Sequence, residues 1–171
     1  ARDALRMAIA TERSGLEFYT RAAALTKDPR GRSVFKKLAG EEKEHLGTLE
    51  KRYRELLAGD PDLESRPTFL FFKGAASGLF AEGTKELREG VNDEQALLIG
   101  IRCERGSHQF FKRYGERFEE SEGRRVFLEF ADEERAHLDL LIGEYRALRA
   151  RQSAPARTAR RPAARGATAR R

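Results

Sequence analysis

With 171 residues, of which 36% are charged and 39% hydrophobic, the chain is long enough for one domain with a sizeable core, and its composition is typical of a soluble helical protein. No apolar stretch approaches the roughly 20 residues of a membrane-spanning helix, so neither an integral membrane protein nor a membrane partner is expected. The net charge of +6 arises at the carboxyl-terminal end, because seven of the 34 basic residues and none of the 28 acidic ones lie in residues 151–171.

Local signals predict two helices in the first third of the chain. The first covers about residues 3–26. Asp28 followed by Pro29 is typical of an N-cap with proline at the first helical position, and it opens a second helix that ends near Ala58, before Gly-Asp-Pro at 59–61. Because only a few residues join the two helices, they are expected to pair antiparallel.

A connection over residues 59–91 separates this hairpin from the next one. We expect it to cross over the bundle and to contain a short helix near residues 81–89. Its apolar cluster, Phe69-Leu70-Phe71-Phe72, is expected to pack on the bundle, and a dimer interface is the alternative use.

Two more helices are predicted in the second half. Asn92 followed by Gln95 resembles a capping box, which opens a helix running to about Phe118. Ser121 is a candidate cap for the last helix, which is expected to fade near Ala150.

The remaining residues, 151–171, are rich in Ala, Arg and Pro, and are predicted to form a disordered, solvated tail. A basic tail can also bind nucleic acid or an acidic surface, so it is the one segment from which such a partner is expected. Residues 1–150 carry 27 basic and 28 acidic groups and are predicted to form a single, nearly neutral domain.

The two hairpins repeat one sequence. When residues 4–56 are laid over residues 96–148, an offset of 92, 20 of 53 positions are identical without a gap, whereas composition alone would give about five. Two copies of one antiparallel hairpin joined by a long crossover predict an all-α four-helix bundle with pseudo-twofold symmetry.

A carboxylate interrupts the apolar stripe of every helix near its middle. These residues are Glu12, Glu42, Glu104 and Glu134. On the second and fourth helices the carboxylate is followed three residues later by a histidine on the same face, His45 and His137. Four buried carboxylates would repel one another, and each costs several kcal/mol unless it is paired or bound to metal.

Two cations would offset the four negative charges. A single Glu-x-x-His is weak evidence, and lone carboxylates are often edge residues that reach solvent. Here two such motifs lie at one repeat offset, and two further glutamates keep the same offset, which favours a metal site. The ligand set suits iron, manganese or zinc and does not choose among them.

The chain resembles the diiron domain of the rubrerythrin family over about residues 3–149. The segments that carry the resemblance are AIATE at 8–12, FY at 18–19, FKKLAGEEKEH at 35–45, CE at 103–104 and FADEERAH at 130–137. The resemblance implies a ferritin-like fold and two bound iron ions. The implied iron ligands are Glu12, Glu42, His45, Glu104, Glu134 and His137.

The resemblance also implies an activity. It suggests a peroxidase- or oxidase-type oxidoreductase that reduces hydrogen peroxide or dioxygen at the diiron site. Tyr19 matches a tyrosine close to the iron pair and is the candidate catalytic residue, although a core aromatic with a satisfied hydroxyl is the alternative. A ferritin-like protein for ferrous iron oxidation and storage and a metal-free structural or interaction bundle are the alternative functions.

The chain departs from the family at the third helix. Rubrerythrins usually carry a further glutamate three residues after the ligand on that helix, and this position is Ser107 here. In the family that carboxylate takes part in a redox-linked shift of one iron. His108, the next residue, is predicted to lie on the inward stripe, either as a substitute ligand or as a histidine beside the ligands or in the core.

A second departure concerns the electron supply. The only cysteine, Cys103, leaves no CxxC pair for a rubredoxin-type domain and is itself expected to be a small core residue. Electrons are therefore expected from a rubredoxin-like or other external donor, or from a segment upstream of Ala1, since the chain does not begin with Met and shows no signal peptide. The family implies a homodimer, and the single cysteine fits a reducing cytoplasm.

Overall fold

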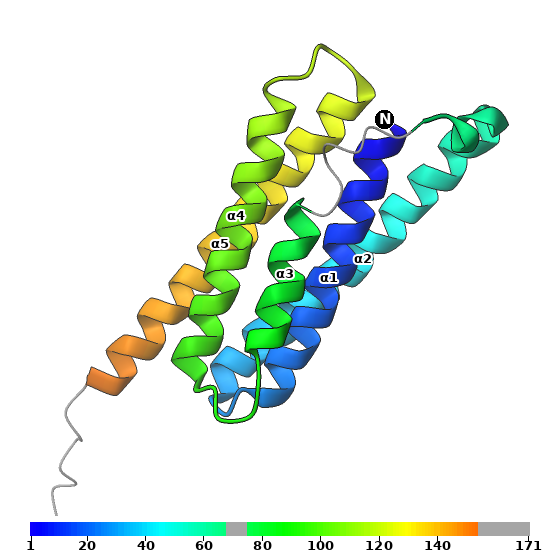
Figure 1. The fold of residues 1–171 in the computed structure, drawn as a ribbon. Helices are drawn as coiled ribbons and strands as arrows, with labels where there is room; N and C mark the ends of the chain where they lie inside the picture. Colours follow the sequence, from blue (N-terminus) through cyan, green and yellow to red (C-terminus); the bar gives the residue numbers. More distant parts are fainter. Residues whose placement is uncertain (68–74, 154–171) are drawn as a thin grey trace, which may run out of the picture.

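The computed structural model describes residues 1–67 and 75–153, and in these ranges it contains helices but no strand. The helices are α1 (Arg2–Leu25), α2 (Pro29–Gly59), the 3-10 helix η1 (Pro61–Ser65), α3 (Ala75–Glu86), α4 (Asp93–Gly115) and α5 (Glu122–Ser153). Helices α1 and α2 form one long antiparallel hairpin and α4 and α5 form the other, side by side in Figure 1. The predicted bundle of two repeated hairpins is confirmed.

The helix starts follow the predicted capping chemistry. The Asp28 side chain accepts a hydrogen bond from the Gly31 backbone at 2.8 Å, and both hydrogen bonds of the Asn92/Gln95 capping box are present. The Ser121 hydroxyl accepts one from the Arg124 backbone at 3.1 Å. These side chains satisfy backbone N–H groups that have no partner within their own helix.

The ends of α4 and α5 differ from the prediction. Helix α4 ends at Gly115, three residues early, because the chain turns there and brings Phe118 edge-on against Phe127, with ring centroids 5.3 Å apart. Helix α5 continues to Ser153, and its Arg151 pairs with Asp28 at 3.0 Å and with Glu144 at 2.7 Å. The rest of the predicted tail lies outside the described residues.

The crossover helix α3 lies between α1 and α4 (Figure 1). It begins and ends earlier than the predicted helix at 81–89. Its Phe80 is fully buried and packs edge-on against Phe18 and Tyr19, with ring centroids 6.0 and 6.2 Å apart. Gly83 allows a close approach to α4, because an added Cβ would lie 2.7 Å from the Cys103 sulfur. The predicted apolar cluster at 69–72 lies outside the described residues.

Cys103 belongs to the core, as predicted. It is buried, and its thiol donates to the Leu79 carbonyl of α3 at 3.3 Å. Burial raises its pKa to about 12, which keeps the sulfur protonated. It is therefore a packing residue between α3 and α4.

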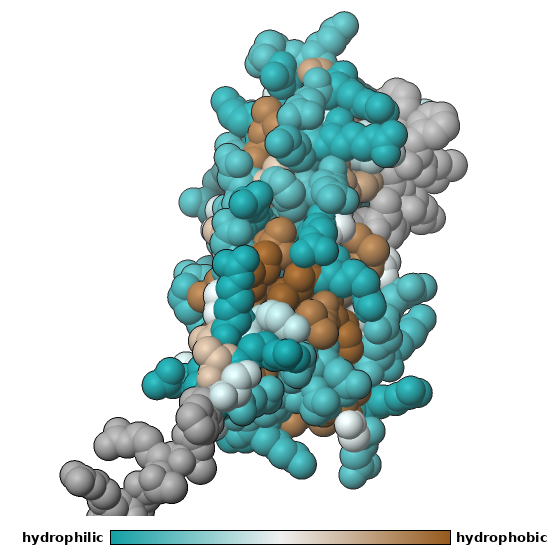
Figure 2. All heavy atoms as spheres, turned by 90° about the vertical axis from the view of Figure 1, so that its left-hand side faces the viewer, coloured by the Kyte–Doolittle hydropathy of each residue, from teal (hydrophilic) through white to brown (hydrophobic). Residues whose placement is uncertain are grey.

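The core consists of two apolar clusters. One gathers Phe18, Tyr19, Phe35 and Phe80, and the other gathers aromatic residues such as Phe111 and Phe127. The face shown in Figure 2 is mostly hydrophilic, with a hydrophobic patch near its middle. None of the described helices is both long and apolar enough to cross a membrane.

Candidate metal centre

One carboxylate from each of α1, α2, α4 and α5 points into the interior of the bundle. Their exposed fractions are 2% for Glu12, 2% for Glu42, 0% for Glu104 and 3% for Glu134. His137 is buried as well, and the side chain of His45 is 27% exposed. The structure therefore brings all six candidate ligands together, at the level where the apolar stripes are interrupted.

Five of the six candidate ligands form two groups that share one carboxylate, and Glu134 belongs to neither group. The first group is Glu12, Glu42 and His45, and the second group is Glu42, Glu104 and His137. In each group, one ligand atom from every residue lies within 4.8 Å of the others, so each could hold a metal ion. The His137 Nδ1 atom lies 3.3 Å from Glu42 Oε1 and 3.6 Å from Glu104 Oε1.

The two histidines lie next to each other at the α2/α5 face of the site. Their rings are stacked, with centroids 5.8 Å apart and an angle of 9° between the planes. The His45 Nδ1 atom lies 3.5 Å from Glu12 Oε2. In both rings Nδ1 is thus the nitrogen that faces the buried carboxylates.

Burial and neighbouring negative charge raise the pKa of two of the carboxyls, Glu42 and Glu134. Burial raises the pKa of Glu42 well above its usual value, and the hydrogen bond and charge of Glu12 add to the effect. Burial also raises the pKa of Glu134, followed by the charge of Glu104, while the Ser107 hydroxyl acts in the opposite direction. These two carboxyls therefore keep their protons to a higher pH than the same groups would in water.

The histidines respond to the same negative charge. The nearby carboxylate of Glu12, whose Oε2 atom lies 3.5 Å from Nδ1, raises the pKa of His45. Burial alone would lower the pKa of His137, but the neighbouring Glu104 carboxylate outweighs this effect, and the pKa is raised. Both rings thus carry a positive charge more readily than a histidine in water, which again reflects a site that attracts cations.

Several buried atoms of the site lack a hydrogen-bond partner within the described ranges. They are Glu12 Oε2, His45 Nδ1, Glu104 Oε2, Glu134 Oε2 and His137 Nδ1. A buried polar atom without a partner costs about 1–3 kcal/mol, and more when it is charged. Carboxylate oxygens and imidazole nitrogens are metal ligands, so bound cations would satisfy all five atoms. The residues present fit a metal centre.

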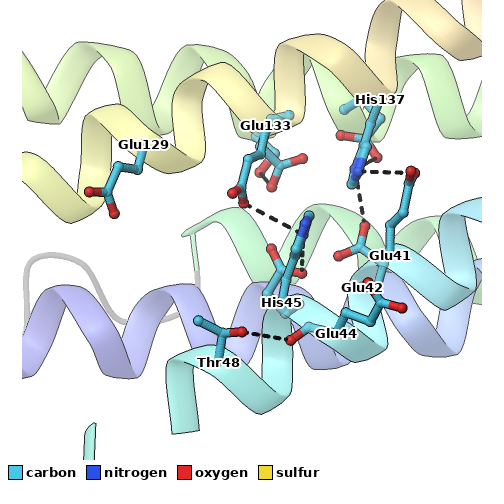
Figure 3. Close-up of polar contacts among 12 residues, drawn as sticks. Glu41, Glu42, Glu44, His45, Thr48, Glu129, Glu133 and His137 are labelled. Atoms are coloured by element: carbon cyan, nitrogen blue, oxygen red, sulfur yellow. Dashed lines mark hydrogen bonds and ion pairs between the residues drawn. The ribbon is translucent and has the colours of Figure 1, made fainter. Parts of the chain in front are cut away.

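Two outer carboxylates were missed by the sequence analysis. Glu133 Oε2 lies 3.5 Å from His45 Nδ1, and Glu41 Oε2 lies 3.8 Å from His137 Nε2, so each outer glutamate faces the histidine of the other repeat (Figure 3). Their side chains are 40% and 35% exposed. The identity of Glu41 and Glu133 at the repeat offset was the signal that could have identified them.

Tyr19 touches the buried carboxylates. It is fully buried, and its hydroxyl donates a hydrogen bond to Glu104 Oε1. Burial raises its pKa well above the usual value of 10.0, and the negative charges of Glu104 and Glu42 add to this. The phenol therefore stays protonated and acts as a hydrogen-bond donor inside the site.

On α4, Ser107 and not His108 points into the bundle, which differs from the prediction. His108 is only half-buried, lies outside both groups, and bonds through Nδ1 to the Ala131 carbonyl at 2.7 Å. Ser107 is the fully buried residue, and its hydroxyl donates to Glu134 Oε1 at 2.7 Å. The inward position on α4 thus belongs to Ser107, because α4 also buries a face against α3.

One of three comparisons with known proteins found a match, and it is to a protein family. No curated protein and no solved structure matches the chain. A family profile described as Rubrerythrin matches residues 3–94, more than half of the chain, which include Glu12, Glu42 and His45. The repeat carries the same residue pattern into the second half, as Glu104, Glu134 and His137. The chain therefore belongs to the rubrerythrin family.

Proposed function

We propose that this protein is a non-haem diiron oxidoreductase that reduces hydrogen peroxide or dioxygen. The observation that carries the proposal is the pair of buried carboxylate–histidine groups that share Glu42. The proposed ligands of the two iron ions are Glu12, Glu42, His45, Glu104, Glu134 and His137. Membership of the rubrerythrin family supports iron over manganese or zinc.

The protein side chains prepare the site for this chemistry. Two ferrous ions, when bound, would supply electrons and Lewis acidity for reduction of an O–O bond. The four carboxylates offset the metal charge, and the two imidazoles supply neutral nitrogen ligands. The buried position excludes bulk water, so the electrostatic interactions among these groups are stronger than they would be in solvent.

Protons for the reduction can be held at two places. The Tyr19 Oη atom keeps its proton and donates it as a hydrogen bond to Glu104 Oε1, inside the site. Glu133 lies at the outer edge of the site, and its side chain is 40% exposed. Its partial burial raises the pKa of its carboxyl. Its position 3.5 Å from His45 Nδ1 suits it to carry protons from solvent to the site. Electrons are proposed to come from a donor outside residues 1–171, because these residues contain a single cysteine and no CxxC pair.

The test is to load the purified protein anaerobically with ferrous iron and then to mix it with hydrogen peroxide or with dioxygen. We expect about two irons per chain, as the two groups require, and much faster oxidation by peroxide than by dioxygen. The growth of many irons per chain would instead indicate iron storage. The absence of bound metal after iron supplementation would contradict the proposal and favour a structural bundle.

Variants test the ligand assignment. Glu42→Ala and Glu134→Ala are expected to lose one or both metals while circular dichroism shows that the helices remain. Glu55→Ala on the exposed side of α2 is the matched control and is expected to keep the metal content of the wild type. Normal metal content in the Glu42 and Glu134 variants would contradict the assignment.

The role of Tyr19 needs a separate variant. Tyr19→Phe removes the hydroxyl that bonds to Glu104 and preserves the ring. We expect this variant to bind iron but to oxidise it more slowly with peroxide. An unchanged rate would show that Tyr19 only fills the core.

A further inference from the structure

Each nitrogen of the His137 ring faces a carboxylate, and the two carboxylates differ in kind. The Nδ1 atom lies 3.3 Å from Oε1 of the buried Glu42 and lacks a hydrogen-bond partner within the described ranges. The Nε2 atom lies 3.8 Å from Oε2 of Glu41, whose side chain is 35% exposed at the edge of the site (Figure 3). The ring therefore lies between the proposed ligands on one side and an outer carboxylate on the other.

The second oxygen of Glu41 has a partner of its own. Lys37 lies one turn earlier on α2, and its Nζ atom is 3.2 Å from Glu41 Oε1. This ion pair leaves Oε2 as the oxygen that faces His137. Three side chains therefore follow one another from the surface into the bundle, with exposed fractions that fall from 59% for Lys37 to 35% for Glu41 and 7% for His137.

The equivalent place in the other repeat is built differently. The offset of 92 pairs Lys37 with Glu129 and Glu41 with Glu133. Because Glu129 is an acid, it cannot anchor Glu133 as the lysine anchors Glu41. The Oε2 atom of Glu133 lies 3.5 Å from Nδ1 of His45, the nitrogen that also faces the buried carboxylates. The histidine of α5 is thus the one whose Nε2 atom faces a lysine-anchored carboxylate.

We propose that Glu41 is a positioning residue for His137. The inference rests on the proposed metal site. A neutral imidazole carries one proton, and it binds a metal through the nitrogen that lacks this proton. Glu41 accepts a hydrogen bond from Nε2–H, so the lone pair of Nδ1 stays directed at Glu42 and Glu104. Lys37 holds the Glu41 carboxylate in this place.

The surroundings of the His137 ring support this role. The ring is stacked with that of His45, with centroids 5.8 Å apart and an angle of 9° between the planes. The 3.8 Å between Nε2 and Glu41 is longer than a hydrogen bond, and a shift of about 1 Å by the partly exposed glutamate closes the gap. A carboxylate that accepts the second N–H of a metal-binding histidine fixes both the position of the proton and the direction of the ring.

Nuclear magnetic resonance of isotope-labelled histidine nitrogens in the Zn²⁺-loaded protein tests the inference, because Zn²⁺ has no redox chemistry. In the wild type, we expect the His137 proton on Nε2 and the metal on Nδ1. In Glu41→Ala, we expect a second set of His137 signals, in which Nε2 binds the metal and Nδ1 carries the proton. His108 is the internal reference, because it lies outside both groups and bonds to the Ala131 carbonyl, and its signals should stay the same.

A titration with Co²⁺ measures the effect on metal affinity. Loss of an outer partner of a metal-binding histidine typically weakens binding about 10- to 100-fold. In Glu41→Ala, we therefore expect one of the two ions to bind at least about tenfold more weakly. In Glu41→Gln, the amide oxygen can still accept the hydrogen bond, so most of the loss should be recovered. Glu55→Ala is the matched control, because Glu55 pairs with Lys51 as Glu41 pairs with Lys37 and is 65% exposed, and its affinities should equal those of the wild type.

The outcomes separate the two proposals. A wild type in which His137 binds Zn²⁺ through Nε2, or a Glu41→Ala variant with unchanged His137 signals and unchanged Co²⁺ affinities, would overturn this inference and leave the metal site intact. A wild type that binds neither metal would overturn both. If Glu41→Ala does not fold, Glu41→Met, which keeps the length of the side chain without a carboxylate, decides the question by the same two measurements.

Discussion

Replacing Glu42 by glutamine should stabilise the metal-free protein although it removes a proposed ligand. The Glu42 carboxyl is 2% exposed and lies among Glu12, Glu104 and Glu134, which raise its pKa together with burial. Glutamine has nearly the same shape and carries no charge. Leaving a buried charged group poorly paired costs about 1–3 kcal/mol, so we expect a gain of about 2 kcal/mol near pH 7. For a domain of this size, that corresponds to a rise of about 4–8 °C in Tm.

The gain should depend on pH in a defined direction. The pKa of Glu42 is higher in the folded protein than the usual value of 4.5. Below this usual value the carboxyl is protonated in both the folded and the unfolded state, so the wild type has no disadvantage. As the pH rises above it, the unfolded state releases the proton first, and the folded wild type becomes less stable. The difference between Glu42→Gln and wild type should therefore be small near pH 4.5 and larger near neutral pH.

The assay is thermal unfolding in the presence of a chelator, followed by circular dichroism at both pH values. Glu55→Gln, an exposed glutamate on the same helix, is the control and should change stability by less than about 0.5 kcal/mol. With metal added, the order should reverse, because ligands that bind only the folded state stabilise the wild type more. A metal-free Glu42→Gln variant that is less stable than wild type by the same amount at both pH values would refute the reasoning.

Three further predictions concern packing and reactivity. Phe80→Ala should lower the free energy of unfolding by about 3–5 kcal/mol in urea titrations, whereas Leu98→Ala, at a side chain that is 44% exposed, should change it little; equal effects would contradict the burial of α3. Gly83→Ala should lower the free energy of unfolding by about 1–3 kcal/mol, because the added Cβ would lie 2.7 Å from the Cys103 sulfur. Adding Cys103→Ala should recover part of this loss, and strictly additive losses in the double variant would exclude the contact. The Cys103 thiol, with burial raising its pKa to about 12, should react with a thiol reagent only after unfolding, and rapid reaction of the native protein would argue against it.

The starts of the helices could be predicted because they depend on residues a few positions apart, and the repeat could be predicted because it is visible along the sequence. Asp28 and Asn92 cap helices through hydrogen bonds to residues three positions away, and these bonds form in the structure. The repeat placed two Glu-x-x-His motifs at one offset, so the two motifs had to occupy equivalent places in the bundle. A carboxylate in the middle of an apolar stripe is visible without any tertiary information.

Which residues of α4 point into the bundle could not be predicted, because their direction depends on how α3 packs against α4. Adjacent residues on a helix point about 100° apart, so a small rotation decides whether Ser107 or His108 points inward. Helix α3 packs on α4 through close contacts at Gly83 and Gly106, and α4 therefore buries Cys103 on one side and Ser107 on another. His108 is left at the edge, bonded to the α5 backbone. The crossover sequence gave only a weak signal for the length and place of α3.

The amino-acid sequence alone determined that four carboxylates and two histidines meet at one level of a duplicated bundle, because helical periodicity and an exact offset of 92 residues leave them no other place. Tertiary structure alone decided which carboxylate both groups share. That choice depends on distances of a few ångströms between side chains of different helices, such as the 3.3 Å between His137 Nδ1 and Glu42 Oε1, and no pattern along one helix contains such distances.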